Sequence, residues 1–371
     1  MDFTKLIGAN LAATLISQGI TTPTPIQAQA MPHILAKDDV IAQSPTGTGK
    51  TLAYLLPVFA ALNTETKAPQ AIIIAPTYEL AAQIAKVAQG LAAAPTDVAL
   101  IIGTASKARQ LETLKAKPKI IVGSIGRVLE HMKDKKLSVH HVKTLVFDEA
   151  DRLFTPENFE AITKLVKATL KHRQILLFSA SLPDDVLQLA KPLMKEPVIL
   201  LPKAKDAMPP NIRHYYIICE AREKFDTARK LVHALKITQA IVFVNIPFTI
   251  EKVTARLNFH KLNAVPLYGS AQKIKRKQAM QAFREGRVRL LVASDIGSRG
   301  LDIPSLAHII NLDLPESEKD YLHRAGRCGR MGRDGMAISL TTRKEAAALT
   351  KFAKKLGILV QEAKIARGRL S

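Results

Sequence analysis

The sequence of 371 residues contains no tryptophan, and aromatic residues make up only 5% of it. Base stacking on aromatic side chains is therefore not expected to dominate binding to a nucleic acid. The two cysteines, Cys219 and Cys328, stand far apart and form no metal-ligand spacing. We expect both to be reduced thiols in a cytoplasmic protein.

Long apolar runs are also missing. No segment approaches the ~20 consecutive apolar residues of a membrane span, and the first residues do not read as a signal peptide. Hydrophobic residues still make up 47% of the chain, enough for the cores of two ordinary domains. Lys and Arg total 54 against 32 Asp and Glu, a formal net charge of +22. This excess fits a polyanionic partner, with solubility or membrane-surface attraction as alternatives.

A glycine-rich segment follows the short apolar run Val40–Ala42. It fits the tail of the P-loop pattern, although Ser44 stands in place of the first glycine. Lys50 would reach the β- and γ-phosphates of a nucleotide, and the Thr51 hydroxyl would ligate Mg²⁺. An ordinary glycine-rich turn is the alternative. The residues predicted to surround the phosphates are Thr46, Gly47, Thr48, Gly49, Lys50 and Thr51.

A second apolar run, Thr144–Phe147, delivers Asp148 and Glu149 to its carboxyl end. In open α/β sheets ligands bind at that edge. Asp148 would hold Mg²⁺, and Glu149 would polarise the attacking water. The alternative is an acidic helix cap, but a cap needs neither the apolar strand nor the upstream lysine loop. Together the two motifs predict an enzyme that hydrolyses a nucleoside triphosphate.

The tetrad from Asp148 to Asp151 resembles that of the DEAD-box family of RNA-dependent ATPases and helicases, and the resemblance runs from Phe3 to about Gly335. It implies ATP and Mg²⁺ as ligands and RNA as partner. Gln27 matches the family's adenine-reading residue, and an amide offers the donor and acceptor that adenine requires. Phe3 matches the aromatic residue that stacks on the base, or it anchors a helix in the core.

The resemblance implies roles for further residues. Tyr78 stands where the family usually has an arginine, which removes one phosphate contact, and Cys328 stands where threonine is common. The residues implied to contact RNA are Pro76, Thr77, Gly103, Arg127, Arg276 and Ser294. Those implied to couple the two domains are Asp151, Ser179, Ser181, Arg299 and His323. Those implied to contact the ribose and the γ-phosphate of ATP are Asp302, Arg327 and Arg330.

Apolar runs alternate with helical stretches along the whole chain, which predicts parallel sheets. With the resemblance, the fold class is α/β: two tandem RecA-like domains, each a mainly parallel sheet flanked by helices. We predict an N-terminal ATP-binding domain over residues 1–203, a linker over 204–211 and a C-terminal domain over 212–371. The predicted strands are Val40–Ala42, Ala71–Ala75, Val98–Ile102, Ile120–Val122, Thr144–Phe147, Ile175–Phe178, Ile241–Val244, Ala264–Leu267, Arg289–Val292, His308–Asn311 and Met336–Leu340.

The predicted function is an RNA-dependent ATPase that locally unwinds or remodels short RNA duplexes or RNA–protein complexes through ATP-driven closure of two domains. It would contact mainly the sugar-phosphate backbone, with weak sequence selectivity, as a monomer acting on ribosomal or ribonucleoprotein assemblies and not on membranes. One alternative is an ATP-dependent RNA clamp or assembly platform with little unwinding. Another is a DNA translocase built on a related core.

Overall fold

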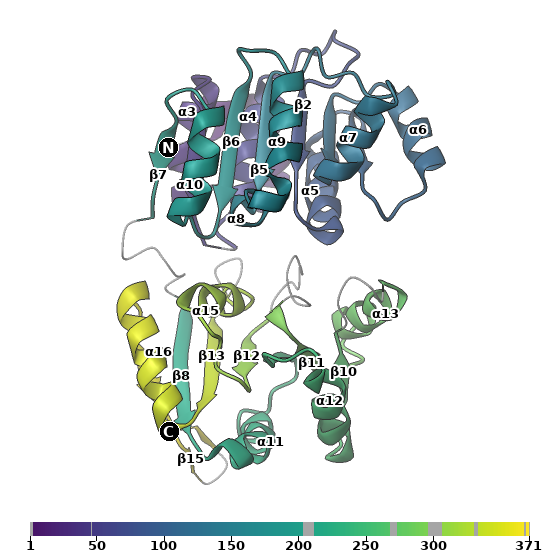
Figure 1. The fold of residues 1–371 in the computed structure, drawn as a ribbon. Coiled ribbons are helices and arrows are strands. Elements are labelled where there is room, and N and C mark those ends of the chain that lie inside the picture. The colour runs from purple at the N-terminus through teal and green to yellow at the C-terminus, as the bar shows by residue number, and fades with distance from the viewer. Residues whose placement is uncertain are drawn as a thin grey trace. The chain divides into compact units, whose positions relative to one another are not determined.

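The computed structural model describes residues 3–45, 47–202, 211–267, 273–295, 306–329, 333–366 and 369–370. The chain divides into two compact units, of which the first ends at Pro202 (Figure 1). The predicted linker lies outside the described residues except for Asn211. The Asn211 side chain donates to the carbonyls of Gly329, at 2.7 Å, and Arg333, both in the second unit.

The first unit is built on a seven-stranded sheet with the order β3-β4-β2-β5-β6-β1-β7. Every neighbouring pair is parallel. Except for the partly exposed edge strand β7, the strands are short apolar runs buried on both faces, which is typical of a parallel sheet covered by helices. Their bounds are β1 Val40–Gln43, β2 Ala71–Ile74, β3 Val98–Ile101, β4 Ile120–Gly123, β5 Thr144–Asp148, β6 Gln174–Ser179 and β7 Val198–Leu200.

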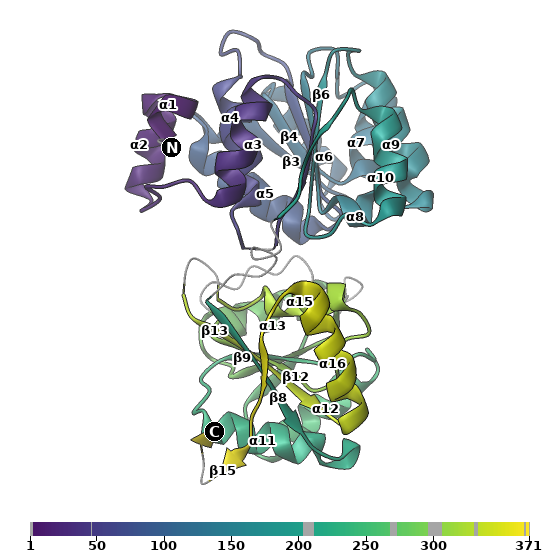
Figure 2. The ribbon, with the colours of Figure 1, turned by 90° about the vertical axis from the view of Figure 1, so that its left-hand side faces the viewer.

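Helices cover both faces of this sheet, and two buried hydrophobic clusters fill the spaces between the layers (Figure 2). Helices α1 to α5 contribute to one cluster, and α7 to α10 contribute to the other. The helices are α1 Phe3–Ile7, α2 Ala9–Ser17, α3 Pro25–Leu35, α4 Lys50–Ala60, α5 Tyr78–Leu91, α6 Lys107–Lys115, α7 Ile125–Lys133, α8 Ala150–Leu153, α9 Pro156–Ala168 and α10 Asp184–Ala190, with 3₁₀ turns at Pro95–Asp97 and Lys191–Leu193.

The second unit repeats this architecture with the strand order β10-β11-β9-β12-β13-β8-β14, again parallel throughout. A small antiparallel pair, β15 and β16, lies outside the main sheet. The strands are β8 Ile212–Ile218, β9 Ala240–Phe243, β10 Ala264–Pro266, β11 Leu290–Ala293, β12 His308–Asn311, β13 Gly335–Thr341, β14 Val360–Glu362, β15 Ile365–Ala366 and β16 Arg369–Leu370.

Two clusters of buried residues again lie on opposite faces of the sheet, one with α13, α15 and α16 and the other with α11 and α12. The helices are α11 Lys224–Ala234, α12 Thr249–Phe259, α13 Lys273–Arg284, α15 Glu318–Ala325 and α16 Arg343–Leu356, with a 3₁₀ turn at Ala221–Glu223. In the part of the chain that the structure describes, no helix combines the length and the apolar character needed to cross a membrane.

Local sequence explains where α16 begins and ends. Thr342 is the N-cap: its Oγ1 accepts from the Glu345 amide at 3.3 Å, and the Glu345 carboxylate accepts from the Thr342 amide at 2.7 Å. This reciprocal pair is a capping box. Gly357 ends the helix with a left-handed φ of 65°, a conformation that glycine adopts without steric cost.

The predicted fold class is confirmed, because both units are parallel sheets flanked by helices. Each strand predicted from an apolar run overlaps an observed strand. Strands β7, β8 and β14 of the two main sheets were not predicted, and neither was the small pair β15 and β16. Residues of β8 alternate between buried and exposed, and β7 and β14 are three-residue strands that are only partly buried, so none of the three forms a continuous apolar run.

Candidate functional site

The glycine-rich loop joins β1 to the start of α4. Gly47 and Gly49 have φ angles of 85° and 91°, left-handed conformations that side chains other than glycine rarely adopt. Helix α4 begins at Lys50, whose Nζ donates to the Ser44 carbonyl across the loop. Thr46 lies outside the described residues. The loop therefore surrounds the start of a helix, where backbone N–H groups favour an anion.

Ser44, which replaces the first glycine of the P-loop pattern, has a structural role here. Its hydroxyl lies 2.6 Å from the Thr48 hydroxyl, and its amide donates to the Ser179 carbonyl at 2.9 Å. The first contact joins the two ends of the loop, and the second ties the loop to the end of β6. The substitution thus adds a hydrogen bond within the loop.

Gln27, the predicted adenine-reading residue, lies against the same loop. Its Oε1 accepts from the Thr24 amide at 2.9 Å, and its Nε2 donates to the Gly49 carbonyl at 3.1 Å. A Cβ atom at Gly49 would lie 2.5 Å from that Nε2, so this contact requires glycine. A primary amide has two donors and an oxygen with two lone pairs. Gln27 therefore keeps one donor and one acceptor beyond these two bonds.

Phe3, the other residue predicted at the base, is buried in the core cluster formed by α1 to α5. The sequence left two roles open for it, stacking on a base or anchoring a helix. Its burial supports the anchoring role in the structure as it stands. Contact with a nucleotide remains a prediction for this residue.

The acidic pair lies at the carboxyl end of β5. Asp148 is only 3% exposed, and its carboxylate accepts from the Tyr54 hydroxyl and the Glu149 amide, each at 2.9 Å. Burial raises the pKa of the Asp148 carboxyl to about 6, while the nearby Lys50 ammonium acts to lower it. Burial also raises the pKa of the Tyr54 hydroxyl well above its usual range, so Tyr54 stays protonated and donates.

The Asp148 carboxylate and the Thr51 hydroxyl are suitable ligands for a magnesium ion. A carboxylate held in a buried site gains from a divalent cation, and Mg²⁺ prefers oxygen ligands. Thr51 and Tyr54 lie within one turn of α4, and Thr51 hydrogen-bonds to the Tyr54 hydroxyl that contacts Asp148. Among the described residues no group of three or more His, Cys, Asp or Glu side chains forms a metal site. Mg²⁺ bound to one or two protein oxygens commonly takes its other ligands from phosphate and water.

Glu149 occupies a strained position. Its φ and ψ are both 52°, the left-handed region, in a residue with a Cβ atom. Such conformations are uncommon outside glycine and often occur at functional sites. Glu149 Oε2 lies 3.4 Å from Arg152 Nε. The turn connects the end of β5 to the start of α8.

Asp151 lies together with the two serines predicted to couple ATP turnover to RNA. Its Oδ1 accepts from the Ser179 hydroxyl at 2.7 Å, and its Oδ2 accepts from the Ser181 hydroxyl at 2.9 Å. The Asp151 amide in turn donates to Ser179 Oγ at 3.4 Å. One carboxylate thus joins the end of the acidic tetrad to the end of β6. Serine at position 181, where the family usually has threonine, supplies the hydroxyl for this bond.

The predicted RNA-contacting residues of the first unit come together at the ends of β3 and β4. Arg127 donates to the Gly103 carbonyl at 3.2 Å and pairs with Glu130 at 2.7 Å. Gly123 lets the end of β4 lie close to the end of β3, because a Cβ there would lie 2.2 Å from the Ile101 carbonyl. Lys107 pairs with the other oxygen of Glu130 at 2.8 Å. Lys107 also pairs with Asp134 at 2.5 Å, so Arg127 belongs to a network of two cations and two carboxylates at this edge of the sheet.

Pro76 and Thr77 follow the carboxyl end of β2, the strand next to β4. The Thr77 hydroxyl accepts from the Leu80 amide at 3.3 Å and caps α5. Tyr78, which replaces the usual arginine, is the first residue of α5 and packs partly buried against the core. This position therefore adds packing to the first unit and contributes no cation.

Sequence reasoning missed the most connected residue of the second unit, Arg324 on α15, which is 1% exposed. It binds both carboxylate oxygens of Asp295, at 2.7 and 2.6 Å. It also donates to Asn245 Oδ1 at 2.8 Å, to the Asp313 carbonyl at 2.7 Å and to Asn311 Oδ1 at 3.4 Å. One guanidinium therefore fixes the chain at the carboxyl ends of β9, β11 and β12.

A sequence signal for Arg324 was present. Asn245, Asp295 and Asp313 each stand one or two residues beyond an apolar run. In a parallel sheet those run ends meet at one edge, so several polar side chains there need a shared donor. Arginine has five N–H donors in a planar fork, more than any other side chain.

The remaining predicted residues of the second unit are placed only in part. Arg327 lies just after α15, and its Nε donates to the His323 carbonyl at 3.2 Å. Both of these side chains are buried, as are Arg276 on α13 and Ser294 at the end of β11. Arg299, Asp302 and Arg330 lie outside the described residues, so the predicted pairing of Arg327 with Arg330 remains a prediction.

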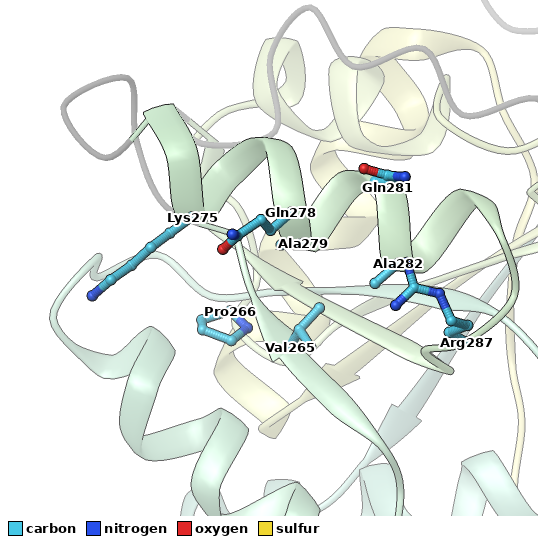
Figure 3. Close-up of a pocket in the computed structure, with 8 residues that line it drawn as sticks. All are labelled: Val265, Pro266, Lys275, Gln278, Ala279, Gln281, Ala282 and Arg287. Atoms are coloured by element: carbon cyan, nitrogen blue, oxygen red, sulfur yellow. The ribbon is translucent and has the colours of Figure 1, made fainter.

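A hollow in the second unit lies apart from these residues. It has a volume of about 480 Å³ between the edge strand β10 and α13, with an apolar floor that includes Val265 and Pro266 (Figure 3). Lys275 and Arg287 lie at its rim. The Asn258 side chain bonds both the amide and the carbonyl of Ala264, and Pro266 has no N–H, so this edge cannot accept another strand. None of the predicted site residues lines the hollow.

Comparison with known proteins gives consistent matches along the chain. The family model described as DEAD/DEAH box helicase matches residues 24–189, and the one described as helicase conserved C-terminal domain matches residues 223–332. The DEAD-box ATP-dependent RNA helicase CshC of Bacillus cereus is 43% identical over 352 residues, 94% of this chain and 90% of that protein. The probable ATP-dependent RNA helicase YfmL of Bacillus subtilis is 42% identical over 355 residues, 95% and 94% of the two chains.

Solved structures show the same arrangement of elements. The structure of S. cerevisiae Dbp5 bound to RNA and ADP BeF3 is 30% identical in sequence, with a TM-score of 0.86 over 97% of this chain and 95% of the other. The match includes both units, since it leaves almost none of either chain uncovered.

The buried Asp148 predicts a pH-dependent stability in metal-free buffer. Its raised pKa means that ionisation of Asp148 disfavours the folded state, so the contribution of this group to stability is fully present below about pH 4 and is lost as the pH rises through about 6. The free energy of unfolding of the native protein should fall relative to Asp148→Asn by about 3 kcal/mol between these limits. Urea denaturation of both proteins across this pH range measures the difference. A difference that does not change with pH would contradict the raised pKa.

The Arg324 network predicts a second effect on stability. Asp295→Asn removes the anionic partner of a buried guanidinium and should lower the free energy of unfolding of the second unit by about 3 kcal/mol. The matched control is Asp226→Asn, because Asp226 forms solvent-exposed ion pairs with Arg229 and Lys230. It should change stability by less than about 1 kcal/mol. Urea denaturation followed by circular dichroism compares the two variants. Equal losses of unfolding free energy would contradict the prediction that the Arg324 network stabilises the second unit more than a surface ion pair does.

Proposed function

This chain belongs to the DEAD-box family of ATP-dependent RNA helicases, and we propose that it is an RNA-stimulated ATPase that locally opens or remodels short RNA duplexes or RNA–protein complexes. The observation that carries the proposal is the contact between α4 and β5. The helix that starts at the glycine-rich loop places Tyr54 on Asp148 at 2.9 Å. This hydrogen bond holds the start of α4, where phosphate would bind, next to the acidic end of β5.

ATP is the proposed substrate. The amides of the loop and the Lys50 ammonium would bind its phosphates, which favour a helix N-terminus. Lys50 would exchange its bond to the Ser44 carbonyl for a phosphate oxygen. The donor and acceptor that Gln27 keeps free match the edge of adenine. Thr51 and Asp148 would hold Mg²⁺, which supplies positive charge against the phosphate oxygens.

Hydrolysis requires that a water oxygen attack the γ-phosphorus while the bond from that phosphorus to the β,γ-bridging oxygen breaks. We assign Glu149 to orient this water and accept its proton, because Glu149 directly follows Asp148, the proposed Mg²⁺-binding residue, in a left-handed turn at the end of β5. Arg327 and Arg330 would stabilise the charge that develops on the phosphate oxygens. Asp302 would contact the ribose.

Coupling between ATP and RNA would use residues from both units. The hydrogen bonds from Ser179 and Ser181 to Asp151 connect the acidic segment after β5 to the end of β6. A movement of one of these segments would therefore displace the other. His323 and Arg299 would extend this coupling into the second unit. If ATP and RNA together favour a closed arrangement of the two domains, each ligand must raise the affinity for the other.

RNA is proposed to bind along strand ends of both sheets. In the first unit the proposed contacts are Pro76, Thr77, Gly103 and Arg127. In the second unit they are Arg276 and Ser294. The net charge of +22 supports a polyanionic ligand, and a structural relative, Dbp5, is described as bound to RNA. Contacts to the sugar-phosphate backbone would give weak sequence selectivity and a strong dependence on salt.

The assignment of Glu149 makes a direct prediction. Glu149→Gln keeps the size of the side chain but cannot accept a proton, so the rate of ATP hydrolysis at saturating RNA should fall by roughly 10²- to 10⁴-fold. Binding of RNA in the presence of a non-hydrolysable ATP analogue should remain. The control is Glu157→Gln, an exposed glutamate on α9 of the same unit, which should leave the rate unchanged. Undiminished hydrolysis by Glu149→Gln would refute the assignment.

A further inference from the structure

Two exposed apolar side chains stand together in the segment between β9 and α12. Phe248 is 95% exposed and Ile246 is 56% exposed. Most phenylalanines of this chain are buried or partly buried, and the other strongly exposed one is Phe259, at the far end of α12. Exposed apolar side chains that gather in one short segment, unlike those scattered singly, can mark a binding contact.

The segment has a fixed conformation. The Thr249 amide and hydroxyl both donate to the Ile246 carbonyl, at 3.0 and 2.7 Å, and the Ile250 amide donates to the Pro247 carbonyl at 3.2 Å. Phe248 has helical dihedral angles, φ −64° and ψ −19°. The ring is therefore carried on a closed turn that leads into α12, and little backbone freedom would be lost when a ligand binds it.

The position of the segment points to the ligand. It directly follows Asn245, which binds Arg324, and Arg324 also binds Asp295. Strands β9 and β11 are neighbours, with Phe243 opposite Ala293. Phe248 therefore lies in the segment that extends from the same sheet edge as Ser294, a proposed RNA contact. A ring at this edge would meet the RNA strand beside its backbone contacts.

We propose that Phe248, with Ile246 beside it, stacks on an unpaired base of the bound RNA, an inference that rests on the proposed function. Every base has a face on which an aromatic ring can stack, so this contact requires no particular sequence. A second copy of the chain is a poor occupant, because two chains of charge +22 repel each other. Stacking would add a contribution to the free energy of RNA binding that salt does not screen, whereas the remaining contacts are electrostatic.

The test measures the affinity for a short fluorescent single-stranded RNA by anisotropy, with a non-hydrolysable ATP analogue and at several salt concentrations. Phe248→Ala should weaken binding by roughly 5- to 100-fold, with an unchanged slope of log affinity against log salt, because no phosphate contact is lost. Phe248→Tyr keeps the ring and should bind like the native protein. Phe259→Ala removes another strongly exposed ring, 82% exposed, from the far end of α12 and should have no effect.

An RNA of the same length without bases separates stacking from general apolar contact. The native protein should bind it more weakly than the normal RNA, whereas Phe248→Ala should lose nothing further. Equal binding of normal RNA by Phe248→Ala and the native protein would overturn the proposal and direct attention to a protein partner for this segment. Such a result would leave the proposed function standing as long as RNA still stimulates ATP hydrolysis. Absence of both RNA binding and stimulation in the native protein would instead reject the proposed function.

Discussion

Parallel strand pairing is the constraint on which the rest of this molecule depends. In a parallel sheet all carboxyl ends lie on one edge, so residues far apart in sequence that follow different strands become neighbours. In the first unit this brings Ser44 of the glycine-rich loop after β1 and Asp151 of the tetrad after β5 into hydrogen bonds with Ser179 at the end of β6. In the second unit it brings Asn245, Asp295 and Asp313 to Arg324.

The carboxyl-end edges of the two sheets differ in how well the protein compensates their buried charges. Arg324 is fully supplied with partners from the protein, so its role is to hold the strand ends of the second unit in place. Asp148 has a raised pKa even though Tyr54, Lys50 and the Glu149 amide act on it. The protein alone does not stabilise the ionised Asp148 carboxyl fully, which is what a site for a cation requires. One edge is therefore structurally complete, and the other would gain stability from a cation bound at Asp148.

Sequence patterns were sufficient for the sheets and for much of the first site. Apolar runs identify buried parallel strands, and the glycine-rich loop is recognisable because a left-handed backbone at Gly47 and Gly49 demands that residue. The short or half-exposed strands β7, β8 and β14 lack this signal. Arg324 was missed because its partners lie far apart in sequence, and only the sheet order reveals them. The exposure of Phe248 was equally hidden, since an apolar residue near a helix start normally predicts core packing.

The most direct test of this account is steady-state ATP hydrolysis by the native protein without nucleic acid, with single-stranded RNA and with single-stranded DNA of matched sequence at moderate salt. The account predicts a low basal rate, strong stimulation by RNA and little by DNA. Equal stimulation by DNA would contradict it and favour a translocase on the same two-unit architecture, and stimulation by neither would contradict the proposed coupling of ATP to RNA.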